Sequence, residues 1–339
     1  MKGDTPLKLF KGKQAAAGIA IIALMIGYVA YRIWREFDAA EVINCIRSAD
    51  MPLLASAFLL MLVFFICEGV NIGRGLSLAG CKVPFFHMLK YSAAGFFFSS
   101  ITPSSSGGQP AQLVLMHRDG IGMHRGILAL ILELVSFQTS MVLISSVSFA
   151  LFHSSICRES ALLYAAGITL NVSVLAFLAV LVFSEKSRRR IAGIAVFFSG
   201  KHRIKTLKWI ARYNMSVMLL KGRKTALLRM IAVSCIQLIS LFSVTYIVYH
   251  ALGMSGEEYF LLTGLQSIVF ASVSALPLPG GAGAAEGGFA LMFYDVFPAD
   301  SMGAAIILTR IMTFIVPVLF TGTVLGLSPV CRRFHTVRV

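Results

Sequence analysis

Long apolar stretches separated by short polar segments recur along the chain from about residue 14 to residue 326. A helix needs about 20 apolar residues, with a range of about 17 to 25, to cross a hydrocarbon core. Stretches of that length predict six spanning helices, at residues 14–34, 52–70, 126–151, 161–183, 226–250 and 302–326. The pattern therefore predicts an all-α, polytopic membrane protein whose first stretch is an uncleaved anchor.

Two further apolar segments are interrupted in the middle. Residues 85–116 contain SITPSSSGGQPAQLV and are flanked by basic residues, whereas residues 259–297 contain SALPLPGGAGAAEGG and are flanked by acidic residues. Lys and Arg concentrate on the cytoplasmic side of membrane proteins. Irregular backbone at membrane depth is tolerated where it lines a cavity or is buried in protein. We therefore expect two re-entrant helical hairpins that open to opposite sides of the membrane.

The interrupted segments align with each other without a gap, with five identities in 17 positions. Phe96 matches Phe270, Pro103 matches Pro277, and Gln112 falls opposite Glu286. The same shift in residue number also superposes the long apolar stretches that precede and follow each interrupted segment. Sequence match and opposite topology predict inverted repeats at about 52–151 and 226–325, joined by residues 152–225, within one integral membrane domain over residues 1–339.

Composition supports a membrane assignment, because 57% of the residues are hydrophobic and only 13% are charged. Of the 30 Lys and Arg residues, twelve lie between residues 184 and 225, interleaved with apolar residues. This distribution predicts an amphipathic segment on the anionic cytoplasmic leaflet rather than nucleic-acid binding. It places both termini in the cytoplasm. Cysteines and histidines lack metal-ligand spacing, so no metal or cofactor is expected.

The interruptions carry the candidate binding chemistry. Pro277 and Pro279 disfavour helix, while Gly280, Gly281 and Gly283 permit tight turns. Half-helices that begin there would direct free N–H groups toward an anion. In the first hairpin, the same arrangement is expected from Ser104, Ser105, Gly107 and Gly108. The alternative is that these small residues only allow close helix packing.

Four ionisable residues lie inside apolar segments, namely Glu68, Glu133, Glu286 and Arg310. An unpaired charge facing lipid is unfavourable, so Glu286 and Arg310 are predicted to meet. Their pair could be purely structural. The functional alternative is that Arg310 holds a lipid phosphate while Glu286 and Glu133 orient the headgroup or bind an amine. Glu68 lies near the predicted end of its helix and could reach the interface.

At these residues the chain resembles the lysylphosphatidylglycerol synthase transmembrane region, also called the flippase-like domain family, over residues 15–330. The most specific part is PLPGGAGAAEGG followed by LTRIMTFIVP, and TPSSSGGQPAQL is a looser match. In ILALILELVSF, Glu133 is retained but Leu134 stands where the family commonly has Arg. The resemblance implies membrane lipids as substrates and an envelope-lipid biosynthetic enzyme as a further partner.

Full-length synthases of that family add a soluble domain that transfers lysine from tRNA to phosphatidylglycerol, whereas only CRRFHTVRV follows the last span here. The leading prediction is therefore a bacterial inner-membrane lipid transporter or flippase. Because no GxxxxGK[ST] loop occurs, we expect no nucleotide hydrolysis. Two alternatives stay open: a lipid-headgroup transferase such as a phosphatidylglycerol lysyltransferase, and a non-transporting scaffold for an envelope-lipid enzyme.

Overall fold

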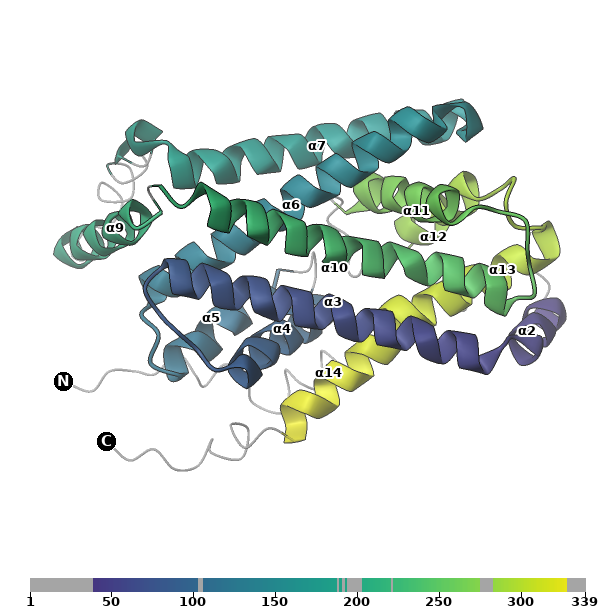
Figure 1. Ribbon diagram of the computed structural model, residues 1–339, viewed down its shortest axis with the longest axis horizontal. Coiled ribbons are helices and arrows are strands. Elements are labelled where there is room, and N and C mark those ends of the chain that lie inside the picture. The colour runs from purple at the N-terminus through teal and green to yellow at the C-terminus, as the bar shows by residue number, and fades with distance from the viewer. Residues whose placement is uncertain are drawn as a thin grey trace.

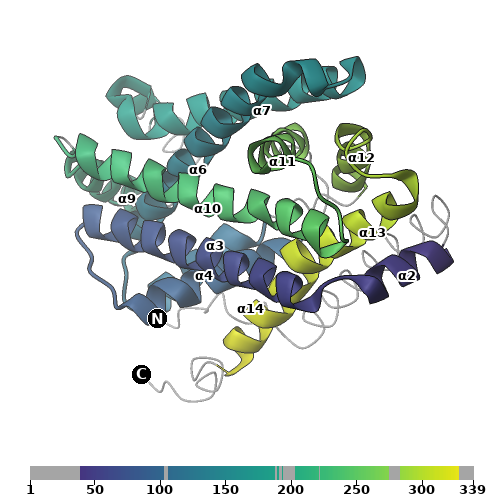
Figure 2. The same cartoon turned by 45° about the vertical axis from the view of Figure 1, so that its right-hand side comes forward.

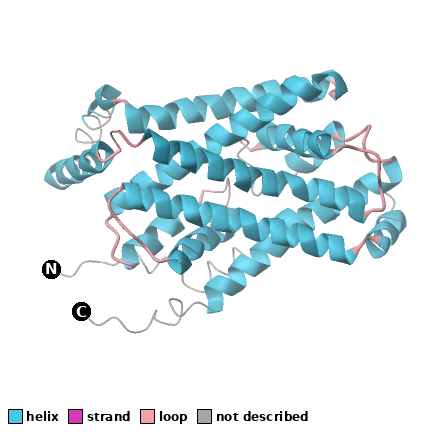
Figure 3. Cartoon of the chain, viewed as in Figure 1, coloured by secondary structure: helices cyan, strands magenta, loops and turns pink. Residues whose placement is uncertain are grey.

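The computed structural model describes residues 39–102, 106–187, 189–190, 193, 203–220, 222–274 and 283–327. Within these ranges the regular structure is entirely helical, and no strand is present (Figure 3). The all-α class predicted from the sequence is therefore confirmed.

Five helices are long and apolar enough to cross a membrane. They are α3 (Met51–Leu78), α6 (Met123–Phe152), α7 (Arg158–Phe183), α10 (Lys224–Ala251) and a last helix formed by α13 (Ala299–Arg310), η6 (Ile311–Ile315) and α14 (Val316–Leu327). They correspond to five of the six predicted spans, and the predicted span at 14–34 lies outside the described residues. The protein is thus a multi-pass membrane protein whose long helices lie side by side (Figure 1).

Three shorter elements lie at the ends of the bundle. Helix α2 (Ala39–Ser48) precedes α3, η3 (His153–Ser155) extends α6, and α9 (Arg203–Met218) precedes α10. Helix α2 lies in the segment between the spans predicted at 14–34 and 52–70. Figure 2 shows α2 beside α13, with which it packs.

Helices α3 and α10 form an antiparallel pair through the middle of the bundle. At one end, the N–H of Asp50, which also caps α3, donates to the carbonyl of Ala251 at 2.8 Å. At the other end, the Arg74 guanidinium donates to the carbonyl of Arg229 at 3.0 Å. The start of α3 therefore adjoins the end of α10, and this pair defines the two ends of the bundle.

The first interrupted segment forms a hairpin of α4 (Phe85–Ser100) and α5 (Gly108–Arg118). Asp119, which follows α5, accepts hydrogen bonds from Lys90 and Tyr91 near the start of α4, both at 2.6 Å. The chain therefore enters and leaves this hairpin at one end of the bundle. Tyr91 also packs in one apolar cluster with Leu76, so the base of the hairpin lies by the end of α3.

The second hairpin consists of α11 (Tyr259–Val273) and α12 (Ala284–Met292). Its base adjoins the end of α10, because Tyr246 stacks edge-on against Tyr259 at 5.1 Å and Tyr249 against Phe297 at 5.5 Å between ring centroids. The two hairpins consequently start from opposite ends of the bundle. Each helix of either hairpin is too short to cross a hydrocarbon core by itself.

Helix bounds recur along the chain with the spacing of the sequence match. Helices α4 and α11 begin at Phe85 and Tyr259, and α5 and α12 end at Arg118 and Met292. Both pairs of bounds are separated by the same offset that aligns the two interrupted segments. Each hairpin is preceded by one long helix and followed by another. The order of elements in the two halves is therefore the same.

Candidate functional site

A cavity of about 340 Å³ lies between the hairpins and the long helices. Most of its wall is apolar and comes from α3, α4, α10, α11, α12 and the last helix. These apolar residues are Met61, Phe64, Phe96, Leu241, Val269, Phe270, Val273, Ala285, Phe289, Ile306 and Phe314. The wall therefore suits a ligand that is partly apolar.

The polar part of the wall comes from both hairpins and from the last helix. Ser99 and Ser100 end α4, and Ser274 follows the last residue of α11. Ser100 and Ser274 are matched positions in the alignment of the two interrupted segments. Gln266, Glu286, Thr309, Arg310 and Thr313 complete the polar lining. The inner ends of the two hairpins thus reach one cavity, although they start from opposite ends of the bundle.

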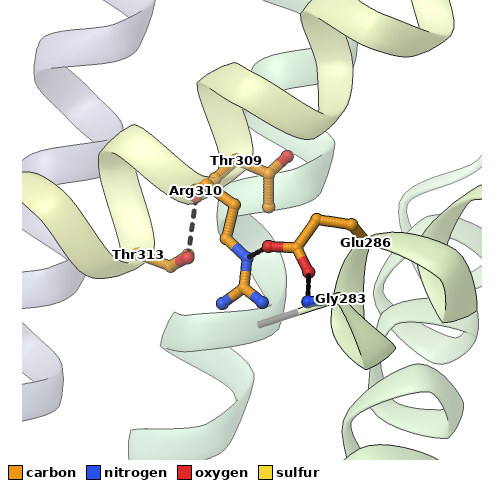
Figure 4. Close-up of polar contacts among 5 residues, drawn as sticks. All are labelled: Gly283, Glu286, Thr309, Arg310 and Thr313. Atoms are coloured by element: carbon orange, nitrogen blue, oxygen red, sulfur yellow. Dashed lines mark hydrogen bonds and ion pairs between the residues drawn. The ribbon is translucent and has the colours of Figure 1, made fainter. Parts of the chain in front are cut away.

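An ion pair lies in the wall of this cavity. The Nε of Arg310 donates to Oε1 of Glu286 at 2.6 Å, and the N–H of Gly283 donates to Oε2 of Glu286 at 2.6 Å (Figure 4). The side chains of Arg310 and Glu286 are 20% and 14% exposed, so the pair is mostly shielded from solvent. The predicted contact between Glu286 and Arg310 is therefore confirmed.

Glu286 also determines the local structure of the second hairpin. Gly283 is the N-cap of α12 and has φ +83°, a conformation that residues with a side chain rarely adopt. Glu286 lies three residues later and accepts the N–H of this cap, as in a capping box. A half-helix begins near Gly283 as predicted, but a carboxylate of the same helix, rather than a ligand, occupies this N–H group.

The last helix is locally widened directly after Arg310. Pro317 has no N–H and so cannot donate to the carbonyl four residues earlier. The N–H of the preceding residue, Val316, bonds to the carbonyl of Ile311, which is five residues back rather than the usual four. The resulting π-helical turn, Ile311–Ile315, follows the residue that carries the cavity's guanidinium. Such turns occur often at functional sites.

Thr309 adds an unusual hydroxyl group to the wall. Its side chain is 5% exposed, and its Oγ1 has no hydrogen-bond partner within the described part of the chain. Its carbonyl accepts a hydrogen bond from the Thr313 hydroxyl at 2.7 Å (Figure 4). Buried hydroxyl groups are usually satisfied, so an unpartnered one in a cavity wall is available to a ligand.

Two predicted site residues lie elsewhere. Gln112 is buried and donates to Oε1 of Glu68 at 3.2 Å, and Glu133 lies within electrostatic range of Glu68. Neither is among the described residues that line the cavity. Glu133 therefore lies outside the described lining that contains Glu286. Glu68 accepts hydrogen bonds from Ser92 and Gln112 of the first hairpin.

The glycines of the first hairpin allow close packing. A Cβ on Gly108 would lie 2.1 Å from Oγ of Ser99 and 2.6 Å from the carbonyl oxygen of Gly95. The N–H of Gly107 donates to Oγ1 of Thr102 at 2.8 Å. Both glycines thus fit the packing alternative considered for them. The remaining predicted positions, Ser104, Ser105, Pro277, Pro279, Gly280 and Gly281, lie outside the described residues.

One residue that holds the site was not predicted from the sequence. Asn171 of α7 is 3% exposed and donates through Nδ2 to the carbonyl of Ala271, near the end of α11, at 2.8 Å. Gln138 donates to Oδ1 of Asn171 at 2.7 Å. Asn171 therefore satisfies one of the free carbonyls at the inner end of α11. A lone asparagine in a spanning helix was the available signal.

The sequence model of the lysylphosphatidylglycerol synthase TM region matches residues 15–321. A "UPF0104 membrane protein" from Archaeoglobus fulgidus is 23% identical over 330 residues, covering 93% of this chain and 98% of that protein. The match to the family model thus covers both hairpins and the long helices, except for the last residues of α14.

Proposed function

The chain belongs to the lysylphosphatidylglycerol synthase TM region family, and from this membership and the central cavity we propose that it moves a lipid headgroup across the membrane. The headgroup is that of an anionic phospholipid, an aminoacyl-phospholipid or another envelope lipid. One observation carries the proposal: two hairpins from opposite ends of an apolar bundle end at one cavity that holds a charged pair.

In this proposal the two hairpins are re-entrant and belong to inverted repeats at about 52–151 and 226–325. Transporters built this way place their substrate between discontinuous helices and open the site alternately to each side. The end of the bundle with the first hairpin's base carries Arg74, Lys90 and Arg118, and α9 packs there through Val217. By the positive-inside bias this end is cytoplasmic, in a bacterial inner membrane.

Arg310 is the proposed anchor for the headgroup. A guanidinium holds a phosphate through parallel hydrogen bonds that the ammonium of lysine does not reproduce. Because Arg310 already contacts Glu286, an incoming phosphate exchanges with that carboxylate or shares the guanidinium with it. Thr309 supplies a further hydroxyl. The cavity volume of about 340 Å³ fits within the ~300–1,000 Å³ common for ligand sites, and the acyl chains of the lipid stay in the bilayer.

The test is a translocation assay in reconstituted vesicles with headgroup-labelled phosphatidylglycerol and phosphatidylethanolamine, read by the labelled fraction that a membrane-impermeant quencher reaches. We expect Arg310→Lys to lower the rate at least about tenfold, which corresponds to ~1.4 kcal/mol. Arg189→Lys is the matched control, because Arg189 forms an exposed ion pair with Glu185. Wild-type rates for every lipid in Arg310→Lys would show that the cavity is structural, and the scaffold alternative would take its place.

A further inference from the structure

A second polar cluster lies apart from the residues that line the cavity, between α3 and the first hairpin. Oε2 of Glu68 accepts a hydrogen bond from the Ser92 hydroxyl at 3.0 Å, and Oε1 accepts one from Nε2 of Gln112 at 3.2 Å. Ser92 belongs to α4 and Gln112 to α5. One carboxylate of a long helix therefore holds both arms of the hairpin.

The packing around this carboxylate is tight. Ser92 is fully buried and Gln112 is 4% exposed. A Cβ on Gly95 would lie 2.1 Å from Nε2 of Gln112 and 3.2 Å from Oε1 of Glu68. Only glycine at position 95 thus lets the Gln112 amide reach Glu68 from across the hairpin.

A second carboxylate, on another helix, lies near this cluster. Glu133 of α6 is 8% exposed and lies within electrostatic range of Glu68. Oδ1 of Asn71, one helical turn from Glu68, is a buried acceptor without a partner among the described residues, as is Oε1 of Gln237 on α10. This part of the bundle therefore holds more acceptors than donors.

The cations nearest in the fold are directed elsewhere. Arg74 donates to a backbone carbonyl, Lys90 pairs with Asp119, and Arg310 pairs with Glu286. The other titratable side chains of the packed helices at this end include Cys67 on α3, His87 and Tyr91 on α4, His117 and Arg118 on α5, His124 and Arg125 on α6, Lys208, Arg212 and Tyr213 on α9, and Lys224, Arg229 and Cys235 on α10. Tyr91 donates to Asp119 and Arg125 to Cys81. Two adjacent carboxylates without a cation do not both stay ionised in a membrane interior, because each raises the cost of charging the other.

We propose that Glu68 and Glu133 form a proton-binding site, separate from the central cavity, whose protonation state controls how firmly α3 holds the first hairpin. One proton, taken from water, binds to a carboxylate oxygen and is later returned to water. With the proton on Glu133, ionised Glu68 makes charge-assisted bonds to Ser92 and Gln112, which are roughly twice as strong as neutral ones. A second proton neutralises Glu68, and the hairpin is held less firmly.

A proton suits these groups better than a divalent metal ion. Calcium takes six to eight oxygen ligands, and within the described residues no three His, Cys, Asp or Glu side chains come together. The donors that face Glu68 are a hydroxyl and an amide N–H, which stabilise a carboxylate directly. Proton binding stands without the proposed lipid transport; only its use to drive the movement of the hairpin during translocation rests on that function.

Infrared spectroscopy of the whole protein in nanodiscs tests the proton. We expect wild type to show a carboxylic-acid carbonyl band at neutral pH that disappears on raising the pH. Glu68→Gln and Glu133→Gln should each lose the band at lower pH than wild type, and the double variant should lack it. Glu159→Gln, at an exposed carboxylate, should match wild type. The proposal is overturned if wild type lacks the band, if the double variant keeps it, or if sodium but not choline shifts the carboxylate bands, which would indicate a metal-cation site.

A labelling experiment tests the hold on the hairpin independently of any lipid. In a cysteine-free background, Ser106→Cys reports on the first hairpin and Ser154→Cys, at an exposed position of η3, reports the intrinsic pH dependence of the reagent. We expect the ratio of their labelling rates to rise severalfold as the pH falls, and to be high and independent of pH in Glu68→Gln. A ratio that stays constant with pH in wild type would refute the coupling. Because neither readout involves transport, failure of this proposal is distinguishable from failure of the proposed function.

Discussion

Substitutions at Arg310 and Glu286 can separate the structural role of their ion pair from a role in binding a lipid headgroup. The perturbation is a double-mutant cycle of Arg310→Met, Glu286→Gln and the combined variant. Methionine keeps the length of the arginine stem without its charge. Glutamine keeps an oxygen that can accept the N–H of Gly283, so the cap of α12 is preserved while the negative charge is removed.

The magnitude follows from the burial of the pair. Each side chain is at least four-fifths shielded, and the contact of 2.6 Å is a charge-assisted hydrogen bond. Removing one member of a buried pair leaves an uncompensated charge and costs about 3–5 kcal/mol, whereas replacing both by neutral groups is often close to neutral. Because the pair borders a cavity, we expect the lower end, about 3 kcal/mol for each single variant. The combined variant should cost clearly less than the sum, with a coupling of at least ~2 kcal/mol.

The assay measures unfolding and translocation on the same preparations. Thermal unfolding in nanodiscs should rank wild type first, the combined variant next and the two single variants last. Translocation should be lost in all three variants if Arg310 binds the headgroup, so the combined variant should regain stability without regaining transport. Additive effects on unfolding would refute the argument for a buried, coupled pair. Recovery of transport together with stability would refute the role of Arg310 in binding.

Other substitutions probe single contacts. Thr309→Val should leave the unfolding midpoint unchanged or raised, because its Oγ1 has no partner within the described residues, but should slow translocation if a ligand uses that hydroxyl. Gly167→Ala should destabilise the fold by about 1–3 kcal/mol, because its Cβ would lie 2.5 Å from Cα of Ser272; Gly287→Ala, with no atom within 4 Å, is the control. Asn171→Ala should cost about 1–3 kcal/mol by leaving a carbonyl of α11 unsatisfied, measured by the same unfolding assay, and a wild-type midpoint would contradict this.

The long helices were predictable because hydrophobic length alone determines them. A run of about 20 apolar residues has few alternatives to a spanning helix, so five predicted spans fall within the helices observed. The interruptions were also visible, since Pro and Gly have local effects on the backbone. Their helices, α4, α5, α11 and α12, correspond to the segments predicted at 85–116 and 259–297, although α5 continues to Arg118.

Part of the site depends on which face each helix turns toward its neighbours. The sequence alone does not specify this. Glu286 and Arg310 were predictable partners because a hairpin and the following helix are neighbours in the chain. Glu68 and Gln112 are 44 residues apart and meet only because α3 packs against the hairpin across Gly95. A carboxylate inside an apolar run signals that a partner exists, but its identity depends on helix packing.

The two hairpins correspond in helix order, yet different chemistry holds each of them. The second is held by Arg310 through Glu286 and by the amide of Asn171, and neither a guanidinium nor an amide changes its charge near neutral pH. The first is held by Glu68, whose charge depends on a proton. If the hairpins move in turn as the repeat arrangement proposes, pH acts directly on the first. Proton concentration on one side of the membrane would then bias which hairpin opens, so an imposed pH gradient should change the net direction of lipid movement in wild type but not in Glu68→Gln.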